Sequence, residues 1–148
     1  MNPNYNIIVT EDKINPASAF DFVFVKENGA NSSFIGTIRN KNLGREVIAV
    51  SYDIFTELAL NMLETICDEA QQLSKDVLKI YISLYKGQLN VGDISIVIAV
   101  SSPHRKESFN ANRFLIEQIK HRCPIWKKEY YIDGNSEWVK GHALCQHE

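Results

Sequence analysis

The stretch ISIVIAVSSPHRKESF, residues 94–109, joins a β-strand directly to a helix. Residues 94–102 form an almost continuous apolar run, which is typical of a strand near the centre of a sheet. Ser102 and Pro103 then begin a helix, with Ser102 as the expected N-cap and Phe109 on the buried side. Pro124 is expected to end this helix. A central strand that runs into a long helix therefore forms the centre of the predicted fold.

Further strands and helices surround this unit without strict alternation, which favours an α+β class. Apolar residues at helical spacing predict an amphipathic helix over 56–74. Asn15 followed by Pro16 predicts the start of a short helix. Strands are expected at 5–10, 32–40, 46–53, 76–87 and 126–132, and a turn at 89–93.

A hairpin is expected between two of these strands, 32–40 and 46–53, because the polar segment 41–45 separates them. This pairing would place Arg39 at one rim of the hairpin and Arg45 at the other. A solvated rim arginine is the simpler interpretation of Arg39 on its own.

The overall composition limits the classes of function. The 148 residues fit a single domain, 1–148, and the net charge of −2 gives no general bias toward nucleic acid or anionic membranes. Three cysteines without a CxxC pair fit a reducing, cytoplasmic compartment. The sequence shows no signal peptide, and its longest apolar run is too short to span a bilayer. Any cationic binding site must therefore be local.

Two local groups of cations stand out. His104 and Arg105 follow a strand at the opening of a helix, where free N–H groups favour anions, although a capped helix with solvated side chains is the simpler interpretation. Lys120 lies in the last turn of that helix, where the helix dipole alone would favour a cation. Lys127 and Lys128 point to opposite faces of the next strand, so only one of them can share a pocket with Lys120. Two amines brought together would lose their protons more easily.

A metal site is not expected. The histidines and cysteines of 121–123 and 142–148 do not match the spacing of a zinc site. Inert packing is the expected role of the thiols, because no Cys-His-Asp or Cys-His-Asn order is visible.

Three segments, in this order, resemble the large, catalytic subunit of molybdopterin synthase. They are FIGTIRNKNLG (34–44), SSPHR (101–105) followed by Phe109, and LIEQIKHRCPIWKKE (115–129). The similarity runs from about Phe34 to Trp138. It implies an α/β-hammerhead fold with a mixed, mainly antiparallel sheet, two longer helices and one short helix.

The resemblance also implies an activity in molybdenum cofactor biosynthesis. The family inserts two sulfurs into cyclic pyranopterin monophosphate (precursor Z) to give molybdopterin. Sulfur arrives as a thiocarboxylate on a small ubiquitin-like subunit, and the assembly is a heterotetramer around a homodimer of large subunits. No metal or organic cofactor is implied. Lys120 and Lys127 are the implied catalytic residues, and the implied substrate pocket comprises Thr37, Ile38, Arg39, His104, Arg105, Lys120, Lys127, Lys128 and Glu129.

The sequence departs from the family pattern at two places. Leu84-Tyr85-Lys86-Gly87 stands where many members have His-Arg-x-Gly, and Tyr52-Asp53 stands where Tyr-Glu is common. We expect neither departure to touch the pocket. Two alternatives remain at this point: a non-catalytic anion-binding or scaffold subunit of the same fold, and a nucleic-acid binder, against which the net charge counts.

Overall fold

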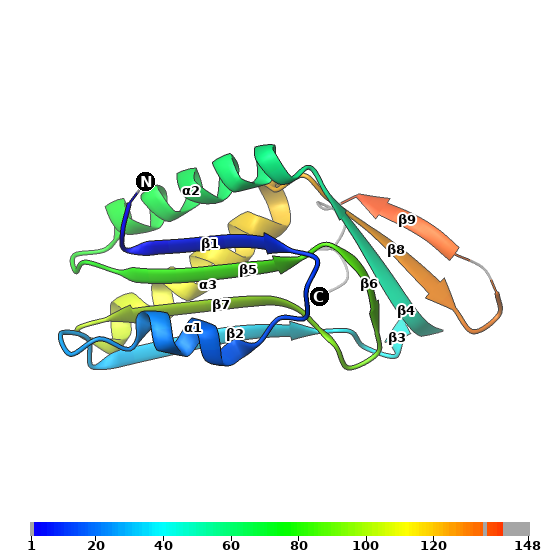
Figure 1. Ribbon diagram of the computed structural model, residues 1–148, viewed down its shortest axis with the longest axis horizontal. Coiled ribbons are helices and arrows are strands. Elements are labelled where there is room, and N and C mark those ends of the chain that lie inside the picture. The colour runs from blue at the N-terminus through cyan, green and yellow to red at the C-terminus, as the bar shows by residue number, and fades with distance from the viewer. Residues whose placement is uncertain (1, 135, 141–148) are drawn as a thin grey trace.

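A mixed, four-stranded sheet forms the larger part of the computed structural model, which describes residues 2–134 and 136–140. Its strand order is β1-β5-β7-β2 (Figure 1). Only the β1–β5 pair is parallel among these strands. The bounds are β1 Tyr5–Thr10, β2 Ala30–Thr37, β5 Lys79–Tyr85 and β7 Ile94–Ser102. The predicted α+β class and mainly antiparallel sheet are confirmed.

Helices cover both faces of this first sheet. The long helices α2 (Thr56–Leu73) and α3 (Arg105–Arg122) lie on one face, and the short α1 (Pro16–Val23) lies on the other. Alternate residues of β5 and β7 therefore enter two cores: Ile82 packs under α2 and α3, whereas Tyr81 packs under α1. Burial on both faces explains why β7 reads as a continuous apolar run.

The start of α1 follows the predicted signal. The Asn15 side chain accepts a hydrogen bond from the Ala17 backbone N–H at 3.1 Å, and Pro16 is the first helical residue. The bounds of α2 differ by one residue from those that the apolar spacing predicts. None of the helices in the described part of the chain combines the length and the apolar composition needed to cross a membrane.

A second sheet, of five strands in the described residues, extends from one end of the first (Figure 1). Its central strand β4 runs directly into α2, and β8 continues the chain just beyond α3, so both long helices are attached to it. Its strands are β3 Lys41–Asn42, β4 Arg45–Ile54, β6 Gly87–Asn90, β8 Ile125–Tyr131 and β9 Ser136–Lys140. The order is β3-β4-β8-β9, and β6 pairs with β4.

The predicted hairpin between 32–40 and 46–53 is wrong. β2 pairs with β7 in the first sheet, whereas β4 pairs with β3, β6 and β8 in the second. The polar segment does turn the chain, but it joins β4 only to the two-residue strand β3. Leu43 and Gly44 have φ angles of 51° and 80°, as a tight two-residue hairpin turn requires. Arg39 therefore follows the end of β2 and does not share a ladder with Arg45.

The first turns of α3 also differ from the prediction. His104, not Ser102, is the N-cap residue, and the Ser102 hydroxyl donates to the His104 carbonyl oxygen at 2.6 Å. Phe109 is 63% exposed, because Ser108 and Asn112 take the inward positions. The Ser108 hydroxyl donates to the Val100 carbonyl oxygen at 3.0 Å, which satisfies a polar group in the core.

Smaller deviations lie at element ends. Leu73 and Val77, apolar residues at the end of the predicted helix 56–74 and the start of the predicted strand 76–87, are 70% and 66% exposed. The segment 89–93, predicted as a turn, contributes its first two residues to β6. Each of these residues lies where a periodic pattern ends, so the period no longer fixes its environment.

Candidate active site

A cavity of about 420 Å³ opens where the two sheets meet, which is a typical size for a small-molecule site. The end of β2, the start of β7, the end of α3 and the start of β8 supply its walls. Its lining residues are Phe34, Ile35, Gly36, Thr37, Arg39, Tyr52, Ile54, Leu84, Tyr85, Ser95, Ile96, Ile116, Ile119, Lys120, Ile125 and Lys127. Most of the wall is apolar, and three cationic side chains supply the charge.

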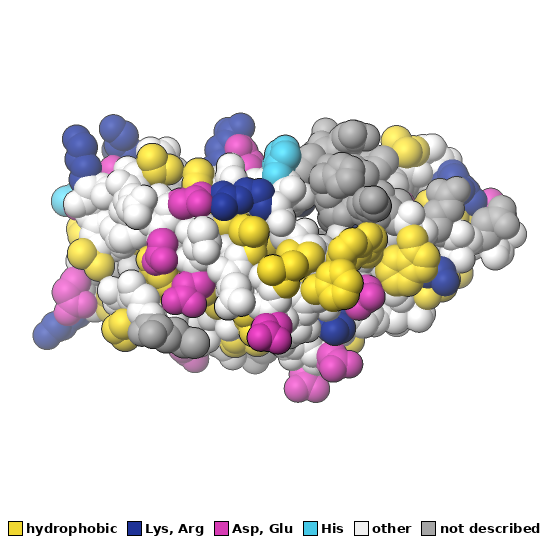
Figure 2. Space-filling view, turned by 90° about the horizontal axis from the view of Figure 1, so that it is seen from above, with side chains coloured by type: hydrophobic (Ala, Val, Ile, Leu, Met, Phe, Trp, Pro, Cys, Tyr) yellow, Lys and Arg dark blue, Asp and Glu magenta, His cyan; other side chains and the backbone are white. Residues whose placement is uncertain are grey.

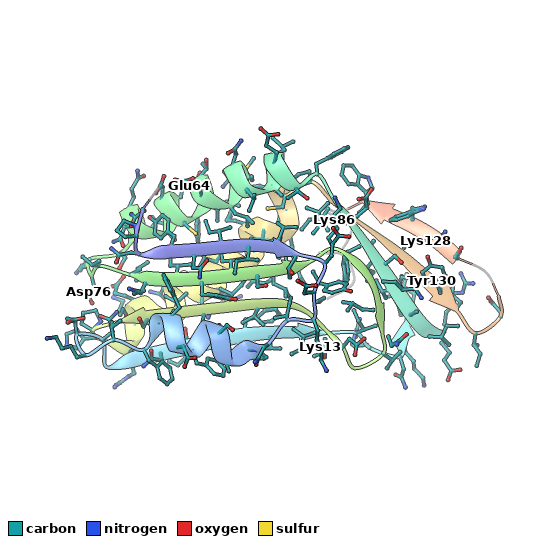
Figure 3. The ribbon with its side chains drawn as sticks, in the orientation of Figure 1. Lys13, Glu64, Asp76, Lys86, Lys128 and Tyr130 are labelled. Carbon is teal, nitrogen blue, oxygen red and sulfur yellow. The ribbon has the colours of Figure 1, made fainter. Side chains whose placement is uncertain are left out.

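The three cations come from separate parts of the chain. Arg39 follows β2, Lys120 lies in the last turn of α3, and Lys127 lies in β8. Lys128 points to the other face of β8, where its amine lies 5.2 Å from the ring centre of Tyr130 (Figure 3). The structure thus places one lysine of the pair in a cavity with Lys120, as strand alternation predicts.

The end of α3 is held in place by an ion pair to α2. The Arg122 guanidinium donates to both carboxylate oxygens of Glu69, at 2.6 and 2.9 Å, and this hydrogen bonding lowers the pKa of Glu69. Lys120 lies two residues before Arg122, is half-buried, and faces the cavity from the same helix end. Trp126, the residue before Lys127 in β8, packs its ring edge-on against Phe55, with 5.1 Å between the ring centres.

Lys127 has the most perturbed environment of the three cations. Burial lowers the pKa of its amine, and the Arg39 guanidinium acts in the same direction. The Glu129 carboxylate, 3.7 Å from the Lys127 amine, opposes both effects. Since the net result is a lowered pKa, the amine gives up its proton more readily than an exposed lysine and is suited to proton transfer.

Tyr52 is a member of the site that the sequence did not reveal. It lies directly opposite Lys127 in the β4–β8 ladder and lines the cavity. Burial raises the pKa of its hydroxyl to about 12; a hydrogen bond with Ser95 opposes this effect, and the negative charge of Glu129 adds to it. The hydroxyl therefore stays protonated and able to donate a hydrogen bond. The strand register brings Tyr52 to Lys127, and the Tyr-Glu pattern, whose tyrosine it matches, does not indicate this position.

The expectation that the departures from the family pattern avoid the pocket is wrong for one of the two. Leu84 and Tyr85, which stand where many members have His-Arg, line the cavity at the end of β5. Asp53, the changed residue of the Tyr-Glu pattern, is not among the lining residues. Lys86, the residue after Tyr85, leaves the cavity and its amine lies 3.3 Å from the hydroxyl oxygen of Thr56.

Four of the nine candidate residues line the cavity: Thr37, Arg39, Lys120 and Lys127. Ile38 packs in the core of the second sheet, and Glu129 is buried beside Lys127. Lys128 lies on the outer face of β8.

His104 and Arg105 lie at the other end of the first sheet. They line a separate depression of about 730 Å³ with the first residues of β2. His104 Nδ1 is 3.7 Å from a carboxylate oxygen of Asp76, which precedes β5. Figure 3 shows Asp76 and Lys86 at opposite ends of this sheet. Within one chain, His104 and Arg105 therefore do not join Lys120 and Lys127.

The described residues contain no group of three or more His, Cys, Asp or Glu side chains that could hold a metal ion. Cys67 and Cys123 are buried free thiols, and burial raises the pKa of each to about 12. Inert packing, the role predicted for the thiols, fits both. Cys145 lies outside the described residues.

These two thiols are expected to resist alkylation in the folded protein. A rise of the thiol pKa from 9 to about 12 reduces the thiolate at pH 8 by roughly 1,000-fold, and the thiolate is the reactive form. Iodoacetamide at pH 8 should label Cys67 and Cys123 at least about 100-fold more slowly than in urea-unfolded protein. Peptide mass spectrometry resolves the two sites. Labelling of Cys123 at the unfolded rate would show that it is accessible.

Comparison with known proteins supplies a family. A family model described as MoaE protein matches residues 9–122. The molybdopterin synthase catalytic subunit of Synechococcus elongatus is 42% identical over 130 residues, which cover 88% of this chain and 79% of the relative. The protein of that name from Bacillus subtilis is 37% identical over 131 residues, covering 88% and 82%.

Solved structures agree. Molybdopterin synthase from Staphylococcus aureus superimposes with a TM-score of 0.80 at 33% identity, covering 92% of this chain and 96% of that one. A protein–protein complex of subunits 1 and 2 of molybdopterin-converting factor from Helicobacter pylori contains the same fold, with a TM-score of 0.69 at 22% identity, covering 93% and 89%. The length of the family match and the identity to the curated relatives lead to one conclusion: this chain belongs to the MoaE protein family.

Proposed function

We propose that this protein is the catalytic subunit of a molybdopterin synthase, which inserts two sulfurs into cyclic pyranopterin monophosphate during molybdenum cofactor biosynthesis. The observation that carries the proposal is the convergence of Arg39, Lys120 and Lys127 on one cavity of ligand size. The names of the curated relatives support it. A non-catalytic scaffold of the same fold would have no need for two lysines at this cavity.

The charges of the two reactants account for a cationic cavity in an acidic protein. The pterin carries a phosphate, and the sulfur donor is a thiocarboxylate, so the reactants repel each other in water. Fixed cations in a mostly apolar wall offset this repulsion and hold both anions in place. Arg39 offers the planar, two-pronged donor that phosphate prefers, whereas the lysines offer compact charges for the thiocarboxylate.

The two lysines are assigned different tasks. Lys120 stabilises the negative charge that develops as the sulfur attacks the pterin. Lys127, whose pKa is lowered by burial and by Arg39, transfers a proton in the same step. Tyr52, whose hydroxyl stays protonated, donates a hydrogen bond to the substrate.

The proposed protein partner is a small ubiquitin-like subunit with a thiocarboxylated C-terminal tail. The complex of two molybdopterin-converting factor subunits from Helicobacter pylori supports a partnership of this kind. Figure 2 shows apolar side chains gathered on the α2 face toward the second sheet. Phe55, Leu58 and Trp138 are each more than half exposed there, and exposed apolar groups of this kind favour a contact with another protein.

A second copy of this chain is proposed to complete the site. β2 is an edge strand of the first sheet, and Asn31, Ser33, Ile35 and Thr37 on it are exposed. The described residues include no strand on its outer side, which leaves a row of backbone groups able to pair with another strand.

Antiparallel pairing of β2 with its copy would join the two halves of the expected pocket. The start of β2 lines the depression with His104 and Arg105, and its end lines the cavity with Lys120 and Lys127. A two-fold axis through the middle of β2 sets the start of one strand beside the end of the other. His104 and Arg105 of one copy would then face the lysines of the other, on the α3 side of the joined sheet.

Reconstitution tests the proposed function. The purified protein is mixed with cyclic pyranopterin monophosphate and a small subunit carrying a C-terminal thiocarboxylate, and dithiolene product is assayed as its fluorescent oxidation product. We expect product only with the thiocarboxylated form, and none with the same subunit ending in a carboxylate. Absence of product from a protein that still binds the small subunit would favour the scaffold role.

A further inference from the structure

Glu129 is a buried carboxylate beside the proposed active site, and its two oxygens have different neighbours. Glu129 is only 2% exposed to solvent. Oε1 accepts hydrogen bonds from the Asn42 side-chain amide at 2.6 Å and from the Tyr131 hydroxyl at 3.2 Å. Oε2 faces the Lys127 amine at 3.7 Å. A carboxylate removed from water needs such partners, so Glu129 is held from two sides.

Asn42 reaches this position from the tight hairpin between β3 and β4. The residue is 8% exposed, although the turn that follows it lies on the surface. Leu43 adopts a positive φ of 51°, which is unfavourable for a branched residue, and its side chain is 77% exposed. The hairpin thus keeps a strained backbone at the point that brings the Asn42 amide to Glu129.

The segment that carries Arg39 runs into the same hairpin and is held on both sides. The Ile38 N–H donates to the Asp93 carbonyl oxygen at 3.0 Å, and the Val47 N–H donates to the Asn40 carbonyl oxygen at 2.8 Å. Together with the Asn42 contact to Glu129, these bonds fix the chain on both sides of Arg39. The backbone on both sides of Arg39 is therefore held by β4 and by the turn before β7, and the Asn42 contact ties the same hairpin to β8.

The distance between Lys127 and Glu129 suggests that the Lys127 amine competes with Asn42 and Tyr131 for the Glu129 carboxylate. An ammonium group and a carboxylate in direct hydrogen-bonding contact lie about 2.7–2.9 Å apart, whereas this pair is 3.7 Å apart. The carboxylate is already bound by the two neutral donors, Asn42 and Tyr131. Lys127 can therefore line the cavity while it remains within reach of a compensating negative charge.

We propose that Asn42 is a positioning residue that holds the Glu129 carboxylate away from Lys127, so that the Lys127 amine stays in the cavity. The role of that amine in sulfur transfer rests on the proposed function, but the positioning itself does not. Without the Asn42 amide, the ammonium becomes the strongest donor available to Glu129. The Lys127 amine then closes on the carboxylate and leaves the cavity.

If Asn42 has this role, two substitutions should shift the pKa of Lys127 in opposite directions, which a merely structural role would not do. The charged or titratable groups around the Lys127 amine are Glu129 on its own strand, Arg39, Lys120 on α3 and Tyr52 on β4. A closer contact with Glu129 raises the pKa of Lys127, so this pKa should rise in Asn42→Ala. Glu129→Gln removes the negative charge that favours the protonated amine, so the pKa of Lys127 should fall. A loosened site would move both variants in one direction.

The experiment follows the Lys127 side chain by NMR in the isolated protein labelled with ¹³C-lysine, with Lys127→Arg used to assign the signal. We expect the titration midpoint to rise by about 0.5 to 1 pH unit in Asn42→Ala, and to fall by a similar amount in Glu129→Gln. Asn40→Ala, an exposed asparagine of the same segment, is the matched control and should leave the midpoint unchanged.

Tyr131→Phe removes the second donor to Glu129 and keeps the aromatic ring over which Arg45 stacks, 3.5 Å from the ring centre. It should also raise the titration midpoint of Lys127, by a smaller amount than Asn42→Ala. This variant tests the proposal if Asn42→Ala does not fold. In the reconstituted reaction, Asn42→Ala should reduce kcat about 10-fold and leave KM for the pterin nearly unchanged. An unchanged midpoint in folded Asn42→Ala or Tyr131→Phe, or shifts of one sign in Asn42→Ala and Glu129→Gln, would overturn the proposal. The titration needs no substrate, so its result stands even if the protein makes no molybdopterin.

Discussion

Lys127→Ala is expected to abolish molybdopterin formation in the reconstituted reaction, with kcat reduced at least about 1,000-fold. The substitution removes both a fixed positive charge and the group whose lowered pKa suits it to proton transfer. Lys120→Ala removes the second amine from the same cavity and should cause a comparable loss. Single-turnover assays with the thiocarboxylated small subunit measure both.

The neighbouring lysine supplies the matched control. Lys128→Ala removes the same side chain one residue along β8, but from the outer face, where the amine lies over aromatic rings. It should lose far less activity than Lys127→Ala. Lys127→Ala and Lys120→Ala should keep the fold, which circular dichroism checks, and the affinity for the small subunit, which calorimetric titration checks. Full activity in Lys127→Ala or in Lys120→Ala would refute the assignment of that residue.

Lys127→Arg separates the two contributions of Lys127. Arginine keeps the positive charge but stays protonated at any working pH, so it cannot transfer a proton. An inactive arginine variant that still binds the pterin would assign proton transfer to Lys127. Recovery of most of the activity would assign a purely electrostatic role.

The parts of the fold that the sequence predicts are those that depend on neighbouring residues. Asn15 and Pro16 mark the start of α1 through a local hydrogen bond and a fixed backbone angle. The partner of β2 could not be predicted in this way. Residues 41–45 do turn the chain, but β2 pairs with β7, whose first residue lies far along the sequence, and no local signal carries that pairing.

The residues of the candidate site likewise fall into those that a local pattern predicts and those that only a distant contact places. Strand alternation separates Lys127 from Lys128, because the period of a strand is local. Tyr52 was missed because only the register of β4 against β8 places it opposite Lys127. The same holds for Asn42, which meets Glu129 through a contact between distant parts of the chain. Such contacts determine where the charged groups of Lys127 and Glu129 lie, whereas sequence motifs show only that these residues are present.

The position of His104 and Arg105 leads to the second large prediction, which concerns two copies of the chain. Arg105→Ala is expected to abolish most activity on its own, because it removes a proposed phosphate ligand, and Lys127→Ala is expected to do the same. If each site combines Arg105 of one copy with Lys127 of the other, a mixed dimer of the two variants has one site with both defects and one site with neither. Co-expression of the two inactive variants should therefore restore activity, to about one quarter of the wild-type value for random pairing.

The recovery depends on pairing of the β2 strands. Ser33→Pro, placed in the middle of the edge strand β2, removes a backbone N–H and disturbs strand pairing there, so it should prevent both dimer formation and the recovery. Its effect on the oligomeric state is measured by analytical ultracentrifugation. Separately purified Arg105→Ala and Lys127→Ala proteins, mixed without subunit exchange, are the negative control. A stable dimer in which co-expression restores no activity would mean that His104 and Arg105 serve no site formed with Lys127 of the other copy. The cationic cavity at the junction of the sheets would then have to bind both anions with Arg39, Lys120 and Lys127 alone.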